Sequence, residues 1–276
     1  MIAKVTIILL ISTIIYLIIN LTNQEKFIIL EKNHKAKEIA KKNTKIPCKI
    51  WQTHETNDLP NSSFKNILRL IKNNPEFEYN FFTKEDRFEY LKKHYNRDVL
   101  NAYTNIKSGA GKADIWRLAV ILREGGIYID VDKVPTQNAV SFISLIDPDD
   151  EMIHGRNWHV WGFDAPAVNS TICARPNHPI IKSTFDSVIN AVNNKKPLKK
   201  IGKHEGWAEL ECYTGTPHLW KALSEHTGNI DMIEGKYSNG LVISNKIEDN
   251  LKQNPEYGND LKELKVKHWS QESVFN

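Results

Sequence analysis

Apolar residues recur at two spacings along the chain, and the two spacings alternate from residue 46 onward. Short apolar or aromatic runs bounded by polar residues, glycine or proline predict strands at residues 46–53, 79–83, 127–129, 152–154 and 171–174. Apolar residues that repeat every three or four positions predict helices at residues 64–71, 84–95, 113–123, 178–192 and 214–223. This alternation of strands and helices is typical of a layered α/β domain.

A different pattern precedes this domain. Val5–Leu21 is a run of 17 uncharged residues dominated by isoleucine and leucine. Such a run is at the short end of what spans a bilayer, for which about 20 residues are typical. The rival interpretation is a cleaved signal peptide, but no small-residue cleavage site follows. We therefore expect a transmembrane anchor at residues 1–22, a basic and partly helical stem at residues 23–45, and one catalytic domain at residues 46–276.

Charge and cysteine content narrow the classes of partner. The net charge is +4, and the basic excess is concentrated in the stem. A nucleic-acid-binding protein would carry a basic face across its folded domain, so we expect no nucleic-acid partner and favour a membrane surface. Taken literally, the lysines after the apolar run place the domain in the cytosol, but the side of the membrane stays open. The three cysteines form no CxxC pair, which argues against a zinc site or a disulfide framework; a single Cys173–Cys212 disulfide stays open.

The most informative run of residues is the one that ends in two aspartates. The predicted helix at 113–123 ends at Gly125-Gly126, because glycine accepts the left-handed conformation of a helix cap. The predicted strand at 127–129 then leads directly into Asp130-Val131-Asp132. Alternate residues of a strand point the same way, so we expect Asp130 and Asp132 to share one side of a strand end, where open α/β sheets bind ligands.

Two carboxylates at such a place offer hard oxygen ligands for magnesium or manganese, which in turn suit a diphosphate. An Asp-x-Asp pair alone is more often a solvated strand end, and the preceding glycine pair and apolar strand are what make the metal site the better interpretation. Asp114 and Arg117 are three positions apart on the preceding helix and are expected to be neighbours. They form either a surface ion pair of little value or a pair that binds a sugar, with Arg117 donating to the acid, the sugar or a phosphate.

The run AGKADIWRLAVILREGGIYIDVD, residues 110–132, resembles the DXD-containing glycosyltransferases of family 32. Asp114, Arg117, the glycine pair, Tyr128 and both aspartates fit the family pattern, whereas Ala113 stands where the family often has serine. Looser similarities extend the resemblance over about residues 46–269, including Thr214-Gly215-Thr216-Pro217.

The resemblance implies a GT-A fold, a single Rossmann-like nucleotide-diphospho-sugar domain with a mixed sheet, and transfer of a hexose with retention of configuration. It also implies Mn²⁺ or Mg²⁺ as cofactor and a UDP- or GDP-linked sugar as donor. The implied site residues are Asp114 and Arg117 at the donor sugar, Asp130 and Asp132 at the cation and diphosphate, Gln52 and Thr53 near the nucleotide, Tyr128 at the substrate, and Trp269 over the diphosphate.

Two other functions compete with the transferase. A glycoside hydrolase also uses paired carboxylates, but its acids face each other across a bond about 5 Å or more apart on separate elements, unlike Asp130 and Asp132. A membrane-tethered sugar-nucleotide or glycan-binding module without activity would retain the binding residues. The sequence leaves the sugar open, and it leaves a glycan, a lipid or a protein as the acceptor.

Overall fold

The computed structural model describes residues 27–40, 42–155, 169–201, 204–205, 208–229, 233–263 and 273–275. Its strands are β1 (Phe27–Ile29), β2 (Asn33–His34), β3 (Lys49–Thr53), β4 (Asp58–Pro60), β5 (Glu78–Phe82), β6 (Gly126–Ile129), β7 (Lys133–Pro135), β8 (Met152–His154), β9 (Thr171–Ala174), β10 (Lys200–Ile201), β11 (His204–Glu205), β12 (Gly235–Lys236), β13 (Leu241–Ile243) and β14 (Leu251–Gln253). Its α-helices are α2 (Asn61–Asn73), α3 (Lys84–His94), α4 (Arg97–Asn105), α5 (Gly109–Glu124), α6 (Pro179–Asn193), α7 (Glu209–Thr214), α8 (Thr216–Thr227) and α9 (Tyr257–Glu263).

One mixed sheet organises the described part of the chain. Eight strands follow the order β12-β13-β8-β9-β6-β3-β5-β2. At its centre β3 pairs in parallel with both β5 and β6, whereas β9 pairs antiparallel with β6. The chain leaves β3 and returns to one side of it as β5, then to the other side as β6. A ligand crevice is expected at the carboxyl ends of strands where such a reversal occurs.

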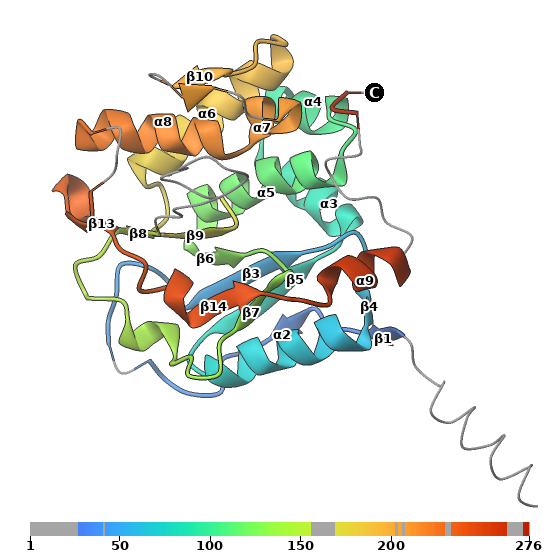
Figure 1. Cartoon of the computed structure of the whole chain (residues 1–276), viewed down its shortest axis with the longest axis vertical. Helices are drawn as coiled ribbons and strands as arrows, with labels where there is room; N and C mark the ends of the chain where they lie inside the picture. The colour runs from blue at the N-terminus through green and yellow to red at the C-terminus, as the bar shows by residue number, and fades with distance from the viewer. Residues whose placement is uncertain are drawn as a thin grey trace, which may run out of the picture.

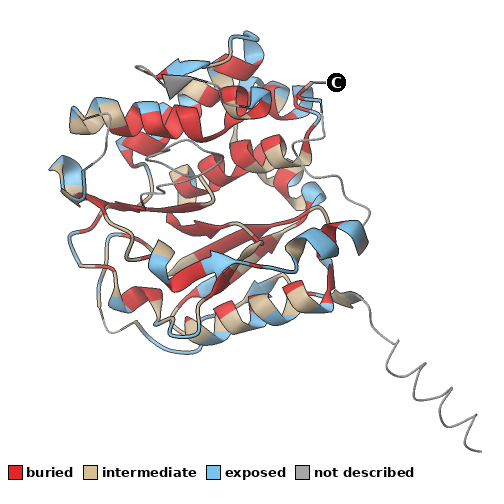
Figure 2. Ribbon diagram, viewed as in Figure 1, coloured by how far each residue is buried: buried red, intermediate tan, exposed pale blue. Residues whose placement is uncertain are grey.

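Each face of the sheet has its own hydrophobic core, because side chains alternate along a strand. Trp51 of β3 and Tyr128 of β6 join a core with the large helices of one layer. Ile50 and Ile127, one residue earlier in each strand, join a second core with α2. Figure 1 shows α5, α6 and α8 on one side of the sheet and α2 on the other. Figure 2 shows that the strands between these layers are largely buried, as are parts of α5, α6 and α8.

Local chemistry sets the boundaries of the elements that precede the site. Thr83 and Asp86 form a reciprocal capping box at the start of α3, which satisfies backbone donors that have no partner within the helix. Helix α5 ends at Glu124 and is capped by Gly125, and Gly125 and Gly126 have φ angles of 66° and 101°. A Cβ on Gly126 would lie 2.5 Å from the carbonyl oxygen of Lys49, so only glycine allows β6 to start so close to β3.

The predicted strands and helices are found in the predicted order from β3 to α8, with shifts of a few residues at their ends. Helices α4 and α7 lie in the same range and were not predicted. The structure differs from the prediction at residues 27–45, which were expected to form a partly helical stem. There β1 pairs with β4, and β2 is the edge strand of the main sheet beside β5. These pairings join residues 33–34 to residues 79–80, and periodicity within a short segment carries no information about such distant backbone partners.

Two further predictions concern a membrane span near the N-terminus and the pairing of the cysteines. The predicted span at Val5–Leu21 lies outside the described residues, and among the described residues no helix has the length and apolar character needed to cross a membrane. The three cysteines are all within the described residues, and none of them forms a disulfide. Cys173 is in β9 and Cys212 is in α7.

Candidate functional site

A cavity of about 1320 Å³ lies at the carboxyl ends of the two central strands. Thr53 ends β3 on one wall, and Asp130 and Asp132 follow β6 on another. The first half of α5 and the segment from Gln253 to Leu261 also line it, as do residues of α3, α4 and α7. Helix α9 is held there because Asp260 accepts hydrogen bonds from Ser62, at 2.5 Å, and from Ser63.

The two aspartates share this cavity, as predicted, but they do so through a turn and not through the pleat of a strand. Strand β6 ends at Ile129, and the backbone N–H of Lys133 donates to the carbonyl of Asp130 at 3.0 Å, which closes the turn. Strand β7 starts at Lys133 and pairs with β14. The expectation that Asp130 and Asp132 are alternate residues of one strand is therefore wrong, since the chain reverses immediately after the last strand residue.

Arg117 connects the predicted sugar-binding pair to the first aspartate. Its guanidinium Nη2 is 3.0 Å from Oδ1 of Asp114 and 3.2 Å from Oδ1 of Asp130. The guanidinium also lies over the ring of Tyr128, 4.6 Å from the ring centre, and the Tyr128 hydroxyl donates to Oδ1 of Asp130 at 2.5 Å. The i, i+3 proximity of Asp114 and Arg117 is confirmed, and the pair is buried in the cavity wall, not on the surface.

The electrostatics of the site favour added positive charge. Burial raises the pKa of Asp114 to about 6, although Arg117 and the hydrogen bond from Thr214 act in the opposite direction. Burial and the neighbouring charge of Asp130 raise the pKa of Asp132 to about 6 as well. The one guanidinium contacts two of the three carboxylates, Asp114 and Asp130, and a divalent cation beside Asp130 and Asp132 would add positive charge where it is lacking.

The residues present fit such a cation. Oδ1 of Asp132 is buried and has no hydrogen-bond partner in the described part of the chain. The contacts made by Tyr128 and Arg117 to Asp130 both go to Oδ1 of that carboxylate. No group of three or more His, Cys, Asp or Glu side chains converges among the described residues. Two carboxylates are nevertheless a sufficient protein contribution for Mg²⁺, which usually takes its other ligands from water and from substrate phosphates.

Two residues that the sequence did not assign to the site hold Asp114. The Asn169 amide donates to Oδ1 of Asp114 at 3.0 Å, and the Thr214 hydroxyl donates to Oδ2 at 2.7 Å. The Asn169 carbonyl oxygen of the backbone also accepts from Arg117 at 2.5 Å. Asn169 begins an Asn-x-Ser/Thr triplet, but its amide is engaged inside the cavity. For Thr214 the available signal was the Thr-Gly-Thr-Pro resemblance, which gave no role.

The corner at the end of β14 holds Asp132 in a similar way. The Gln253 amide donates to Oδ2 of Asp132 at 2.7 Å, and the backbone N–H of Asn254 donates to the Asp132 carbonyl at 2.7 Å. Gln253 and Asn254 both line the cavity. They are 121 and 122 positions beyond Asp132, and the sequence signal for them, two polar residues before Pro255, is too common to have been used.

The remaining predicted residues occupy different places. Thr53 lines the cavity. Gln52 is buried behind the aspartate turn, where its side chain accepts from Tyr79 at 2.9 Å and donates to the Asp130 carbonyl at 3.3 Å. Gln52 therefore stabilises the aspartate turn from behind. Trp269 lies outside the described residues.

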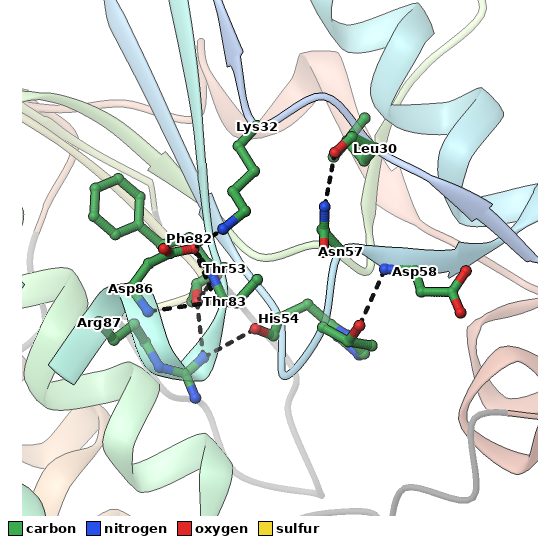
Figure 3. Close-up of polar contacts among 11 residues, drawn as sticks. Leu30, Lys32, Thr53, His54, Asn57, Asp58, Phe82, Thr83, Asp86 and Arg87 are labelled. Carbon is green, nitrogen blue, oxygen red and sulfur yellow. Dashed lines mark hydrogen bonds and ion pairs between the residues drawn. The ribbon is translucent and has the colours of Figure 1, made fainter. Parts of the chain in front are cut away.

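A second buried arginine supports the wall beside Thr53. Arg87 donates to the Thr53 hydroxyl at 2.7 Å and to the His54 carbonyl at 3.4 Å, as Figure 3 shows. It also donates to Tyr103 at 3.3 Å and forms an ion pair with Glu55. These contacts fix the end of β3 against α3, and Glu55 lines the cavity.

Comparisons with known proteins agree with this geometry. Residues 60–155 match the family described as "Glycosyltransferase sugar-binding region containing DXD motif". The chain is 26% identical to an uncharacterized glycosyltransferase of Acanthamoeba polyphaga mimivirus, over 68% of this chain and 69% of the relative. It is 24% identical to the initiation-specific alpha-1,6-mannosyltransferase of Candida albicans, over 75% of this chain and 61% of the relative.

A shorter match and a solved structure complete the comparison. A mannosyl phosphorylinositol ceramide synthase of Saccharomyces cerevisiae is 31% identical over 32% of this chain and 22% of its own length. The chain thus spans less than two thirds of the two fungal enzymes. The solved PaToxG glycosyltransferase superposes with a TM-score of 0.50 at 20% identity, over 65% of this chain and 69% of that one, which supports the predicted GT-A-like fold. These matches show that the chain is similar to DXD-containing glycosyltransferases of the family 32 type, and the turn that carries Asp130 and Asp132 lies within the residues that the family model matches.

Proposed function

We propose that the chain transfers a hexose from a nucleotide-diphospho-sugar to an acceptor in a reaction that depends on Mn²⁺ or Mg²⁺ and retains the anomeric configuration. The observation that carries the proposal is the aspartate turn at the carboxyl end of β6. It brings Asp130 and Asp132 to one cavity and leaves Oδ1 of Asp132 buried without a hydrogen-bond partner among the described residues. Retention rests on the resemblance to family 32.

The donor extends through the cavity from the aspartates in two directions. Asp130 and Asp132 hold the cation, which neutralises charge on the leaving nucleoside diphosphate. Asp114 and Arg117 line the same cavity and bind the hydroxyl groups of the donor sugar, with Asn169 and Thr214 keeping the Asp114 carboxylate in place. The nucleoside lies toward Thr53 at the end of β3.

The chain's own residues act by positioning and by electrostatics, which is sufficient for group transfer of this kind. Arg117 joins Asp114 to Asp130, so the sugar site and the cation site are fixed relative to each other at contacts of 3.0 and 3.2 Å. A shift in either carboxylate would therefore misplace the other, and the reacting carbon of the sugar would move relative to its acceptor.

The names of the relatives indicate which donor sugar to test first. Several carry mannosyltransferase names, and the yeast synthase name includes a mannosylated ceramide. Mannose is therefore the first sugar to test, and a membrane lipid is one of the three acceptor classes, with a glycan and a protein as the others. The predicted anchor at residues 1–22 would hold the enzyme at a membrane.

The test uses the full chain, kept in detergent or lipid, and asks whether it hydrolyses a nucleotide-sugar donor or transfers the sugar. A panel of UDP- and GDP-linked sugars, mannose included, is incubated with manganese, and release of the nucleoside diphosphate is measured. Release from one donor that stops with EDTA and with Asp132→Ala establishes a metal-dependent transferase and names its sugar. A chain that neither releases nor binds a nucleoside diphosphate in the presence of manganese would overturn the proposal.

A further inference from the structure

The corner formed by Gln253 and Asn254 carries a second polar atom with no partner. Asn254 is 4% exposed and lines the cavity. Its amide nitrogen Nδ2 is buried and has no hydrogen-bond partner in the described part of the chain. Its Oδ1, in contrast, accepts from the backbone N–H of Glu256 at 3.1 Å, so the side chain is held in one orientation.

The neighbouring residue, Asp132, carries a hydrogen-bond acceptor that has no partner among the described residues. The backbone N–H of Asn254 donates to the Asp132 carbonyl at 2.7 Å, so the two residues are direct neighbours. Within the described ranges Oδ1 of Asp132 also has no hydrogen-bond partner, while Oδ2 accepts from Gln253. Two residues joined through the backbone thus each carry one buried polar atom without a partner in the described part of the chain, a donor on Asn254 and an acceptor on Asp132, although buried polar groups are nearly always satisfied.

A ligand that carries both a cation and an anionic oxygen would satisfy both groups. The unpartnered carboxylate oxygen of Asp132 suits a divalent cation. The unpartnered N–H of Asn254 suits an oxygen of a phosphate bound to that cation, and a hydrogen bond to a charged acceptor is stronger than one between neutral groups. A metal–diphosphate complex has both features, whereas a free cation has only one.

We propose that Asn254 binds the nucleoside diphosphate directly, by donating its amide N–H to a phosphate oxygen beside the cation on Asp132. The assignment rests on the proposed function, because it takes the metal–diphosphate complex as the ligand. It adds to the aspartate turn a contact from Asn254, which directly follows β14. The antiparallel pairing of β14 with β7 holds this part of the chain next to the turn.

The sharpest variant is Asn254→Asp, which keeps the shape of the side chain and its acceptor for Glu256 but replaces the N–H donor by a charged oxygen. We expect the affinity for UDP or GDP in the presence of manganese to fall by about tenfold or more. The affinity for manganese alone should stay unchanged or rise, because a carboxylate is added near Asp132. Calorimetry measures nucleotide binding, and the electron paramagnetic resonance of free manganese measures metal binding.

Lys252→Ala is the matched control, since Lys252 is an exposed residue of the same strand and should leave both affinities unchanged. Thermal unfolding confirms that each variant is folded. If Asn254→Asp binds the manganese–nucleotide complex as tightly as the unaltered chain, Asn254 is a structural residue and the assignment is wrong. If the unaltered chain itself binds neither nucleotide with manganese, the proposed function fails, and this assignment fails with it.

Discussion

Two buried arginines stand on the walls of the same cavity, and their surroundings differ. Arg87 is satisfied at every nitrogen: it contacts Tyr103 through Nε, Thr53 and the His54 carbonyl through Nη1, and Glu55 through Nη2. Arg117 contacts Asp114 and Asp130, but its Nε has no partner among the described residues.

Buried atoms without a partner among the described residues occur near both arginines, including the two ring nitrogens of His54 beside Arg87. Near Arg117 the carboxyls of Asp114 and Asp132 have pKa values raised to about 6 by burial, and Asp132 and Asn254 each have an unsatisfied buried atom. Natural proteins tolerate such unsatisfied groups where a ligand completes them. The comparison suggests that Arg87 holds the fold and that Arg117 belongs to the site, and the predictions below test this division.

The largest effect is expected from Asp132→Asn. Loss of one charged cation ligand should reduce transfer by about 1000-fold, since a bound metal contributes several kcal/mol to the charge stabilisation of such a reaction. The free energy of unfolding should not fall, because the variant removes a buried charge. Steady-state kinetics and urea denaturation measure the two quantities. A variant that transfers normally would remove Asp132 from the site.

Arg87→Met is expected to show the reverse pattern. It leaves Glu55 without its cation and removes a donor from Thr53, so the free energy of unfolding should fall by about 3 kcal/mol. The turnover number per folded molecule should change little. Denaturation and active-site titration at low temperature separate the two effects, with Arg97→Met, an exposed arginine at the start of α4, as control. Loss of turnover in a fully folded Arg87→Met protein would contradict the division.

Acid should destabilise the fold through a residue that lies outside the surroundings of both arginines. His154 in β8 is fully buried, and burial lowers the pKa of its imidazole to about 4. In the unfolded chain the same imidazole has a pKa of about 6.5, so the unfolded chain takes up the proton first as the pH falls. The free energy of unfolding is therefore unaffected by His154 above pH 6.5 and decreases as the pH falls toward 4. The loss between pH 7 and pH 5 should be about 2 kcal/mol from this residue. Urea denaturation over this range measures it, and His154→Leu should show a smaller loss; equal losses would exclude His154 as the cause.

The smallest effect is expected from Tyr128→Phe. It removes only the hydroxyl that donates to Asp130, at 2.5 Å, and leaves the ring beneath Arg117. The loss of one hydrogen bond to a carboxylate corresponds to about 1–2 kcal/mol, which would appear as a roughly tenfold higher KM for the donor. An unchanged KM would show that Arg117 alone fixes the orientation of Asp130.

Much of the site could be predicted because its residues are close together in the sequence. Asp114, Arg117, Tyr128, Asp130 and Asp132 lie within 19 residues on one helix, one strand and one turn. Helical spacing is enough to place Asp114 beside Arg117. The residues that complete the site, Asn169, Thr214, Gln253 and Asn254, lie 37 to 122 positions beyond Asp132 and carry no local signal.

The amino-acid sequence by itself determined the alternation of strands and helices, the break at Gly125-Gly126 and the two carboxylates that follow β6, because backbone preferences and side-chain periodicity act over a few residues. Only the tertiary structure decided that the aspartates share a cavity through a turn, that residues 27–34 form strands, and that β14 delivers Asn254 to Asp132. Strand pairing and cavity walls join residues that are far apart in the chain, and the free energy of those contacts exists only once the whole sheet has formed.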